Sequence, residues 1–419
     1  MEPDRFSGSF SFALNISPRP SIFASLANSW KVIHLSTGHE GGAGLAARRL
    51  NSALNAQGIQ STFGALKNPR YVPGPNEFTI LRKFRQRLLS GLLIRIQRLL
   101  SEKVLFSVMS LNVCTLKQVR ELGDPKNTIL HFHNWYNLIS QKEILRLNKE
   151  GYRIVLTLHD ERFFTGGCHY AFECKKFRID CNACPELANV FNRLPSKNLN
   201  SIAKLLEESN SHLVFIAPSR WIKEEALSSL LLKNQRVVFI PNTLGIKGES
   251  MKPQLYTPRE PQSVLKIGIA SMDNSSYIKG GDLILEVESR IASSNLQIKM
   301  IYLSQINEQD SPKEFWGMID YLLVASRADN SPNVIHEAKS FGIPVIASDI
   351  GGISELIYKD YDIAIPGHDI SSRKILEILT GLKSIERASN SDAMGKKFLD
   401  YVAESVESHK NLYLSLMKK

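Results

Sequence analysis

Two acidic residues eight positions apart, Asp329 and Glu337, stand on either side of the run NSPNVIH. The simplest interpretation is structural: Asp329 or Asn330 caps a helix, Pro332 lies in its first turn, and Glu337 is a solvated helix residue. However, the turn leaves N–H groups of the helix start free to bind an anion, and carboxylates on both flanks can accept hydrogen bonds from hydroxyl groups. A sugar carried on a nucleoside diphosphate supplies both groups.

The elements that must position these acids alternate between strand-like and helical segments. The strand-like runs are continuously apolar, which is typical of parallel strands covered on both faces and predicts an α/β fold. They are KVIHLS, TILHFH, RIVLTL, LVFIA, VVFIP, LKIGIA, QIKMIYL, DYLLVA and PVIAS.

The chain is long enough for two domains. A segment with three prolines and no periodicity, IKGESMKPQLYTPREPQS, separates the first five runs from the rest. We therefore expect a loose extension at 1–29, a doubly wound domain at 30–245 and a second at 246–393. The long helical pattern at 394–417 is expected to pack back on the first domain.

Polar residues follow three strands of the first half, where open α/β sheets bind ligands. They are His131, His133 and Asn134 after TIL, His159 and Asp160 after RIVLTL, and Ser219 and Arg220 after LVFIA. One histidine at a strand end is ordinarily a structural hydrogen-bonding group, but three polar strand ends together favour a cleft. There Asp160 is expected to orient His159 or share its proton.

A glycine-rich segment, STGHEGGAGLAARRL, follows the first strand. Gly42, Gly44 and Ala47 fit G-x-G-x-x-A, but no acid lies between Glu40 and Glu77 to hold a ribose, so a dinucleotide site is not indicated. What remains is a loop opening a helix, whose N–H groups can face an anion or a sugar.

Four of the five cysteines are clustered in CHYAFECKKFRIDCNACP, at Cys168, Cys174, Cys181 and Cys184. The closing C-x-x-C suits a structural zinc held by four thiolates. Two disulfides or buried free thiols are the alternatives.

The net charge is +11 with a pI near 9.3, which favours an acidic partner. The basic segment LRKFRQRLLSGLLIRIQRLLSEK fits either a helix on an anionic membrane surface or an ordinary surface helix, because Arg85 and Arg95 interrupt its apolar stripe. No apolar run is long enough to span a membrane, the first residues lack a signal-peptide pattern, and no nucleic-acid-binding motif occurs.

The run from Asp329 to Glu337 resembles the E-x7-E motif of retaining glycosyltransferases with the two-domain GT-B fold, in the large group often called family 4. The resemblance covers nearly the whole chain and is closest to the branch that builds exopolysaccharides such as colanic acid. The other motifs that carry it are GGAGLAARRLNSAL, TLHDERFFTGGCHY, CNACP, APSRW, IPNT, KGGDLIL and PNVIHEAKSFGIPVIASDIGG.

This resemblance implies a role for each matching position. Glu337 would hold the ribose of the donor nucleotide, and Asp329 would meet the transferred sugar beside Asn330, Ser331, Pro332 and Asn333. Lys279 would neutralise the donor diphosphate, and His159 would approach the reacting sugar and phosphate. Gly41, Gly42 and Gly44 would close over the donor, and, from their places at the strand ends, His133, Asp160 and Arg220 are expected to line the acceptor site or the cleft.

Two departures from the family pattern stand out. The first acid is Asp329 where the family has glutamate, one methylene longer, and the arginine usual after the first strand of the second domain is missing from LKIGIASMDNSSYIKGG. Losing one cation from a diphosphate site weakens leaving-group stabilisation.

The resemblance thus predicts transfer of a hexose-type unit from a nucleoside diphosphate sugar to a growing, lipid-linked glycan at the cytoplasmic membrane face, with no metal needed for catalysis. A metal-dependent GT-A enzyme would rest on DYD at Asp360 to Asp362, which fits a turn better. The two departures leave a second alternative, a sugar-nucleotide-binding scaffold without transfer activity.

Overall fold

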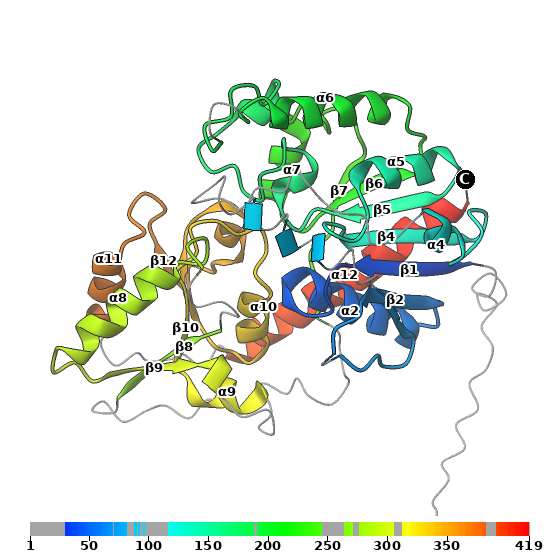
Figure 1. Ribbon diagram of the computed structural model, residues 1–419. Helices are drawn as coiled ribbons and strands as arrows, with labels where there is room; N and C mark the ends of the chain where they lie inside the picture. Colours follow the sequence, from blue (N-terminus) through cyan, green and yellow to red (C-terminus); the bar gives the residue numbers. More distant parts are fainter. Residues whose placement is uncertain are drawn as a thin grey trace, which may run out of the picture.

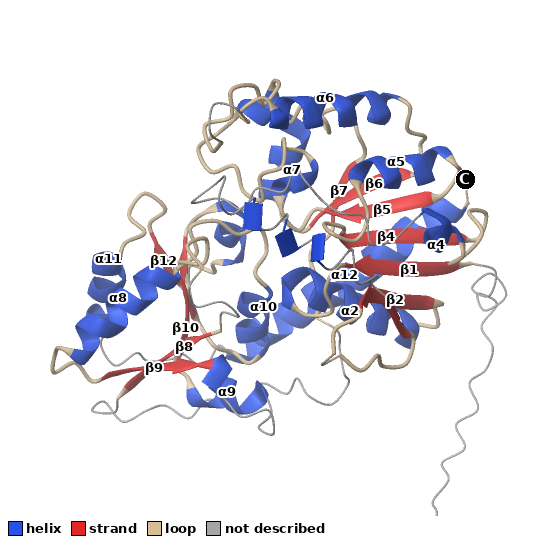
Figure 2. Cartoon of the chain, viewed as in Figure 1, coloured by secondary structure: helices blue, strands red, loops and turns tan. Residues whose placement is uncertain are grey.

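The computed structural model describes residues 30–69, 71–81, 116–187, 191–244, 264–270, 276–305, 312–382 and 391–418, with positions 88, 89, 91, 92, 95 and 96. The predicted extension at 1–29, all of the predicted linker, and most of the basic segment after Leu81 lie outside the described residues. Two parallel sheets, each with its own helices, confirm the predicted α/β architecture of two doubly wound domains (Figures 1 and 2).

The first sheet is parallel and has the order β3-β2-β1-β4-β5-β6-β7. In this doubly wound arrangement, the direction in which successive strands are added reverses between β1 and β4. Its strands are β1 (Lys31–Ser36), β2 (Ser61–Leu66), β3 (Glu77–Ile80), β4 (Thr128–Asn134), β5 (Arg153–Thr157), β6 (Leu213–Ala217) and β7 (Val237–Phe239). Its helices are α2 (Gly41–Ala56), α4 (Leu116–Arg120), α5 (Gln141–Lys149), α6 (Leu194–Glu207) and α7 (Arg220–Ser228), with short 3-10 turns η1 (Glu161–Phe163) and η2 (Lys176–Arg178).

The second sheet has the order β12-β11-β10-β8-β9 and reverses between β8 and β10. Its strands are β8 (Leu265–Ile269), β9 (Ile298–Tyr302), β10 (Tyr321–Val324), β11 (Val345–Ser348) and β12 (Ile363–Ile365). They are connected by α8 (Gly281–Ala292), η3 (Leu303–Gln305), α9 (Pro312–Met318), α10 (Asn333–Ser340) and η4 (Gly351–Leu356), and α11 (Ser372–Gly381) follows.

The central strands β1, β4, β5 and β6 of the first sheet are buried on both faces, which explains their continuous apolar sequences. Alternate residues of β1 face opposite layers: Ile33 and Leu35 pack in the same core cluster as α4 to α7, while Val32 packs with α2 and the C-terminal helix. His34 has the same parity as Val32, so an imidazole is placed in an apolar layer.

The C-terminal helix α12 (Ser391–Met417, red in Figure 1) joins the two domains. Tyr401 stacks on His336 of α10, and Leu412, Tyr413 and Leu416 pack into the α2 side of the first sheet. Each such buried side chain contributes roughly 1.5–3 kcal/mol relative to an exposed one, so the helix holds the domains together.

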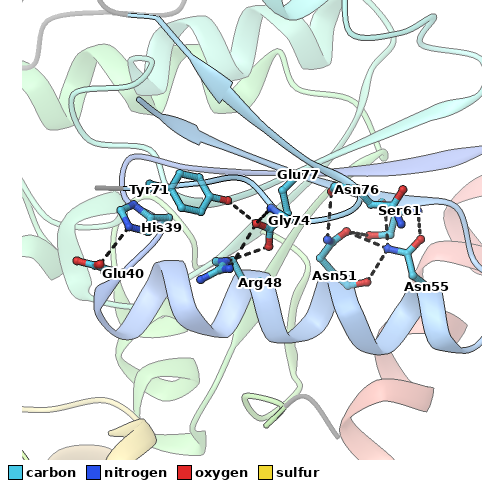
Figure 3. Close-up of polar contacts among 10 residues, drawn as sticks. All are labelled: His39, Glu40, Arg48, Asn51, Asn55, Ser61, Tyr71, Gly74, Asn76 and Glu77. Carbon is cyan, nitrogen blue, oxygen red and sulfur yellow. Dashed lines mark hydrogen bonds and ion pairs between the residues drawn. The ribbon is translucent and has the colours of Figure 1, made fainter. Parts of the chain in front are cut away.

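A polar network fixes helix α2 against the edge of the first sheet (Figure 3). Arg48 donates to Glu77 at 2.9 Å, Tyr71 donates to the same carboxylate, and Asn51 accepts from Ser61 at 2.7 Å. Although burial opposes ionisation, these donors lower the pKa of Glu77. Consecutive residues of a helix point in different directions. Because Arg48 faces this network, the next residue, Arg49, points towards a different part of the structure.

Candidate active site

The loop after β10 presents Asp329 and the residues that follow it. Asp329 is 6% exposed, and one carboxylate oxygen accepts from the Asn330 N–H at 2.8 Å while the other is held by the Lys279 ammonium. The following glycine pair allows this loop to pack closely: a Cβ on Gly352 would lie 1.6 Å from the Asn330 carbonyl oxygen. Gly351 adopts φ +51°, a conformation that favours glycine.

Lys279 reaches Asp329 because of the turn that follows β8. Gly280 has φ +71°, and a Cβ there would lie 2.0 Å from the Ala325 carbonyl oxygen at the end of β10. The turn therefore packs directly on β10. Lys279 and Asp329 thus stand beyond β8 and β10, the strands between which this sheet reverses.

Glu337 lies in α10, which begins after Pro332. Pro332 offers no side-chain cap to the first N–H groups, as an anion-binding helix start requires. The Glu337 carboxylate accepts from Arg49 of α2 at 2.6 Å, an ion pair between the two domains. Arg49 was not predicted from the sequence, since its position in α2 gives no sign of a partner 288 residues away.

The loop at 329–333 is also bound to the first domain by three asparagine amides. Asn330 donates to the Leu158 carbonyl at 2.7 Å, and Asn333 donates to the Gly42 carbonyl at 2.9 Å. Asn242, from the IPNT motif, donates to the Ser331 carbonyl at 3.3 Å. The predicted donor loop therefore lies directly against the strand ends of the first domain.

Ser219 and Arg220, which follow β6, also lie at the domain interface. Ser219 caps α7 by accepting from the Ile222 N–H, and its hydroxyl donates to the Asn330 side chain. Glu355 of η4 accepts the backbone N–H of Arg220 at 2.9 Å. The Arg220 guanidinium lies 4.7 Å from the Phe239 ring centroid, so its backbone binds the second domain while its charge remains at the surface.

His159 follows β5, next to Leu158 and so beside Asn330. Its Nε2 lies 3.1 Å from Nδ1 of His133, and burial lowers the pKa of His159 to about 4, so the imidazole is neutral at pH 7. Among the described residues the Asp160 carboxylate hydrogen-bonds Arg162 and not His159, and Arg162 lowers the pKa of Asp160 against the effect of burial. The charge of Asp160 still acts to raise the pKa of His159 against the effect of burial. His133 is 5% exposed and lies behind His159, not at the cleft surface.

Gly41, Gly42 and Gly44 form the first turn of α2, where the sequence predicted a loop. Gly41 has φ +74°, and a Cβ on Gly44 would lie 2.4 Å from the Gly38 carbonyl oxygen. The helix has no acidic residue in its first turn and no side-chain cap from Glu40. Its amides are therefore available at the domain interface.

The four clustered cysteines are free thiols that lie close enough to affect one another. Burial, followed by the neighbouring thiols, raises the pKa of Cys168. Backbone N–H groups of Glu186 and Leu187 hydrogen-bond the Cys184 sulfur, and Cys181 and Ala183 have positive φ. Within the described residues no three sulfurs lie within 4.8 Å of one another, so zinc would require them to move closer.

A cavity of about 630 Å³ lies between the cysteine loop and the turn before Lys279, with Phe172, Lys175 and Tyr277 in its lining.

In the DYD motif, Asp360 lies in a turn and the buried Asp362 pairs with Lys339 at 2.6 Å, so this motif offers no open metal site. In the described part of the chain, no helix is long and apolar enough to cross a membrane.

Comparison with known proteins places these features in context. The sequence model of the family described as glycosyl transferases group 1 matches residues 273–391. The Escherichia coli K12 protein named putative colanic acid biosynthesis glycosyl transferase WcaC is 24% identical over 369 residues, which cover 81% of this chain and 87% of that protein.

Similar solved structures extend over both domains. Sucrose-phosphate synthase from Thermosynechococcus elongatus has a TM-score of 0.55 at 15% identity, covering 93% of this chain and 99% of that one. The catalytic domain of Arabidopsis thaliana starch synthase IV, bound to ADP and acarbose, has 0.55 at 11% with the same coverage. Anabaena HepE, in complex with UDP and glucose, has 0.51 at 16%, covering 92% and 99%.

Proposed function

Because this chain has the GT-B fold and its residues 273–391 match the group 1 glycosyl transferase model, we propose that it transfers a sugar from a nucleoside diphosphate sugar to a growing glycan. The observation that carries the proposal is the loop from Asp329 to Asn333. It joins a cation, two carboxylates and a free helix start to the strand ends of the other domain.

The donor would bind with its diphosphate at Lys279 and the first N–H groups of α10. Negative charge grows on the leaving diphosphate as the sugar departs, and a fixed ammonium and fixed N–H groups stabilise that charge. Glu337 would accept from the ribose hydroxyls, and Asp329 from the transferred sugar. The structures of HepE with UDP and glucose and of starch synthase IV with ADP support a nucleotide donor.

We infer retention of the anomeric configuration, with the acceptor attacking from the face that the diphosphate leaves. Asp329 is occupied by Lys279 and the Asn330 N–H, so it is placed to hold a sugar hydroxyl and not to act as a covalent nucleophile. Charge stabilisation at the leaving group would then supply much of the rate.

For the acceptor we propose a lipid-linked intermediate of an exopolysaccharide at the cytoplasmic membrane face. WcaC is named for colanic acid biosynthesis, and the net charge of +11 suits an anionic surface. The cavity beside Tyr277 is large enough for a sugar unit, and its aromatic side chains suit the apolar face of a pyranose.

A nucleotide-release assay tests the proposal. Purified protein is incubated with UDP-, GDP- and ADP-sugars and an acceptor extract, with Asp329→Ala and Glu337→Ala as controls. A thermal-shift screen of the same donors identifies the base, since a ligand stabilises the fold in proportion to its affinity. Release that depends on both acids supports transfer, whereas donor binding without release would identify a sugar-nucleotide-binding scaffold.

A further inference from the structure

Three histidines form a hydrogen-bonded chain from the sheet interior to the candidate active site. Nδ1 of His34 lies 3.0 Å from Nε2 of His133, and Nδ1 of His133 lies 3.1 Å from Nε2 of His159. His34 is fully buried and His133 is 5% exposed, whereas His159 is partly exposed. One end of the chain is therefore closed and the other meets the cleft.

Hydrogen bonding links the protonation of the three rings. A neutral imidazole carries one N–H and one bare nitrogen, so a ring that donates through one nitrogen must accept through the other. If His34 donates from Nδ1, then His133 donates from Nδ1 to His159, and His159 carries its own proton on Nδ1. In the opposite arrangement His159 carries its proton on Nε2, and His34 holds a buried N–H at Nε2.

The buried end distinguishes these two arrangements. Nε2 of His34 has no hydrogen-bond partner within the described part of the chain. A buried N–H without an acceptor is rarer in proteins than an acceptor without a donor. The arrangement that leaves a bare nitrogen at His34 is therefore favoured.

We propose that His34 and His133 are positioning residues that hold His159 in the tautomer with its proton on Nδ1, so that His159 offers an N–H to an oxygen of the bound ligand. This identification rests on the proposed function: the oxygen is one of the sugar or of the diphosphate of the donor. A neutral imidazole at this position can donate a hydrogen bond to the negatively charged leaving group. Unlike an imidazolium, it carries no extra proton that it could transfer to that group.

A metal ion is the competing use of this cluster, because His34, His131 and His133 have ligand atoms within 4.8 Å of one another. However, His131 binds Tyr413 through Nδ1 and Thr157 through Nε2, and both nitrogens of His133 are used. Of the six ring nitrogens, Nε2 of His34 is the one without a partner in the described part of the chain. A three-imidazole site would have to break existing hydrogen bonds, so the chain of histidines is the better explanation.

Nitrogen NMR on protein labelled with 15N-histidine tests the tautomers directly, since it distinguishes N–H from bare ring nitrogens. We expect protonated Nδ1 on His34, His133 and His159 at pH 7.5, with the ten histidines assigned by single His→Asn variants. A proton on Nε2 of His159 would overturn the proposal. This measurement needs no substrate, so it stands even if every donor sugar fails to react.

A matched pair of variants tests the consequence. His34→Asn keeps an N–H donor near the Nδ1 position and His34→Leu removes it, while both remove the ring. We expect His34→Leu to move the His159 proton to Nε2 and to lower kcat about tenfold, and His34→Asn to stay within about threefold of the wild type. Equal losses of kcat in both variants, or a bound metal that His34→Leu releases, would overturn the positioning role of His34.

Discussion

Arg49 of helix α2 donates from Nη2 to the Glu337 carboxylate of helix α10 at 2.6 Å, and its Nη1 is buried without a partner in the described part of the chain. A cation of the first domain therefore orients the acid that should bind the donor nucleotide in the second. Since a carboxylate accepts on both oxygens, a ribose hydroxyl can use Oε2 while Arg49 remains on Oε1. We therefore expect Arg49 to influence donor affinity through Glu337.

Donor binding to Arg49 and Glu337 variants tests this coupling. We expect Glu337→Gln to raise the donor Kd roughly tenfold, because it weakens a hydrogen bond to a charged group worth about 1.5–3 kcal/mol. Arg49→Leu should raise Kd by a smaller factor, and the double variant should resemble Glu337→Gln alone. Calorimetric Kd values for the four proteins complete the cycle. Additive effects would show that Arg49 contacts the donor independently.

Lys279 and Asp329 should govern the chemical step more than nucleotide binding. We expect Lys279→Met to lower kcat about 10²- to 10³-fold, as loss of one charge-stabilising donor typically does. Asp329→Asn should lower kcat while leaving the Kd for the free nucleoside diphosphate within about twofold, because Asp329 is proposed to bind the sugar and not the nucleotide.

Lys374→Met provides the matched control, since Lys374 is on the same domain and its ammonium pairs with Glu377 at the surface. If the loss of activity in Lys279→Met were no greater than in this control, Lys279 would not be the diphosphate cation.

A continuous apolar run is sufficient to identify strands buried on both faces, such as β4, β6 and β10, and it also identified β9, which is only partly buried. β2, β3 and β12 were missed. In β2, polar and small residues interrupt the apolar run STFGAL. β3 and β12 are short segments that are covered by neighbouring parts of the chain and not marked by an apolar run of their own. The sequence also predicted that Asp329 and Asn330 precede a helix that contains Glu337, because one loop and one helix carry them all.

Contacts across the domains could not be derived in this way. Arg49, Glu355 and Asn242 each bind a residue that is far away in the sequence. Asp160 shows the same limit locally: adjacency suggested a pairing with His159, yet the 3-10 turn after it brings Arg162 back onto the carboxylate. A partner two residues away displaced the expected one because a bidentate guanidinium pair is stronger.

Buried histidines should make the fold sensitive to acid. Burial lowers the pKa of seven described histidines: His34, His131, His133, His159, His169, His336 and His409. The unfolded chain titrates near pH 6.5, so their contribution to stability is complete above pH 6.5 and falls as the pH drops towards their folded values. Each histidine costs about 1.4 kcal/mol per pH unit in that window.

Glu161 acts in the opposite direction, since burial raises its pKa to about 7 and favours its protonated form in the folded chain. Seven groups against one still predict a net loss, seen as a fall in the urea midpoint from pH 7.5 to 5.5. His34→Asn should flatten this dependence by about one proton. An unchanged midpoint across the range would contradict the burial of these rings.

We propose that the cysteine cluster binds one zinc ion per chain, with its sulfurs drawn closer together than they lie in this structure. N–H groups already hydrogen-bond the sulfur of Cys184, and Cys181 and Ala183, just before it, have positive φ. Deprotonation of these buried thiols is costly unless a cation compensates, and zinc supplies that charge. Elemental analysis of protein purified without chelators should therefore give about one zinc, lost in Cys184→Ala and kept in Cys114→Ala, the cysteine outside the cluster. Two results would show that the cluster is not a zinc site. One is metal-free protein whose four cluster thiols react with a thiol reagent. The other is a mass four hydrogens short, as two disulfides require.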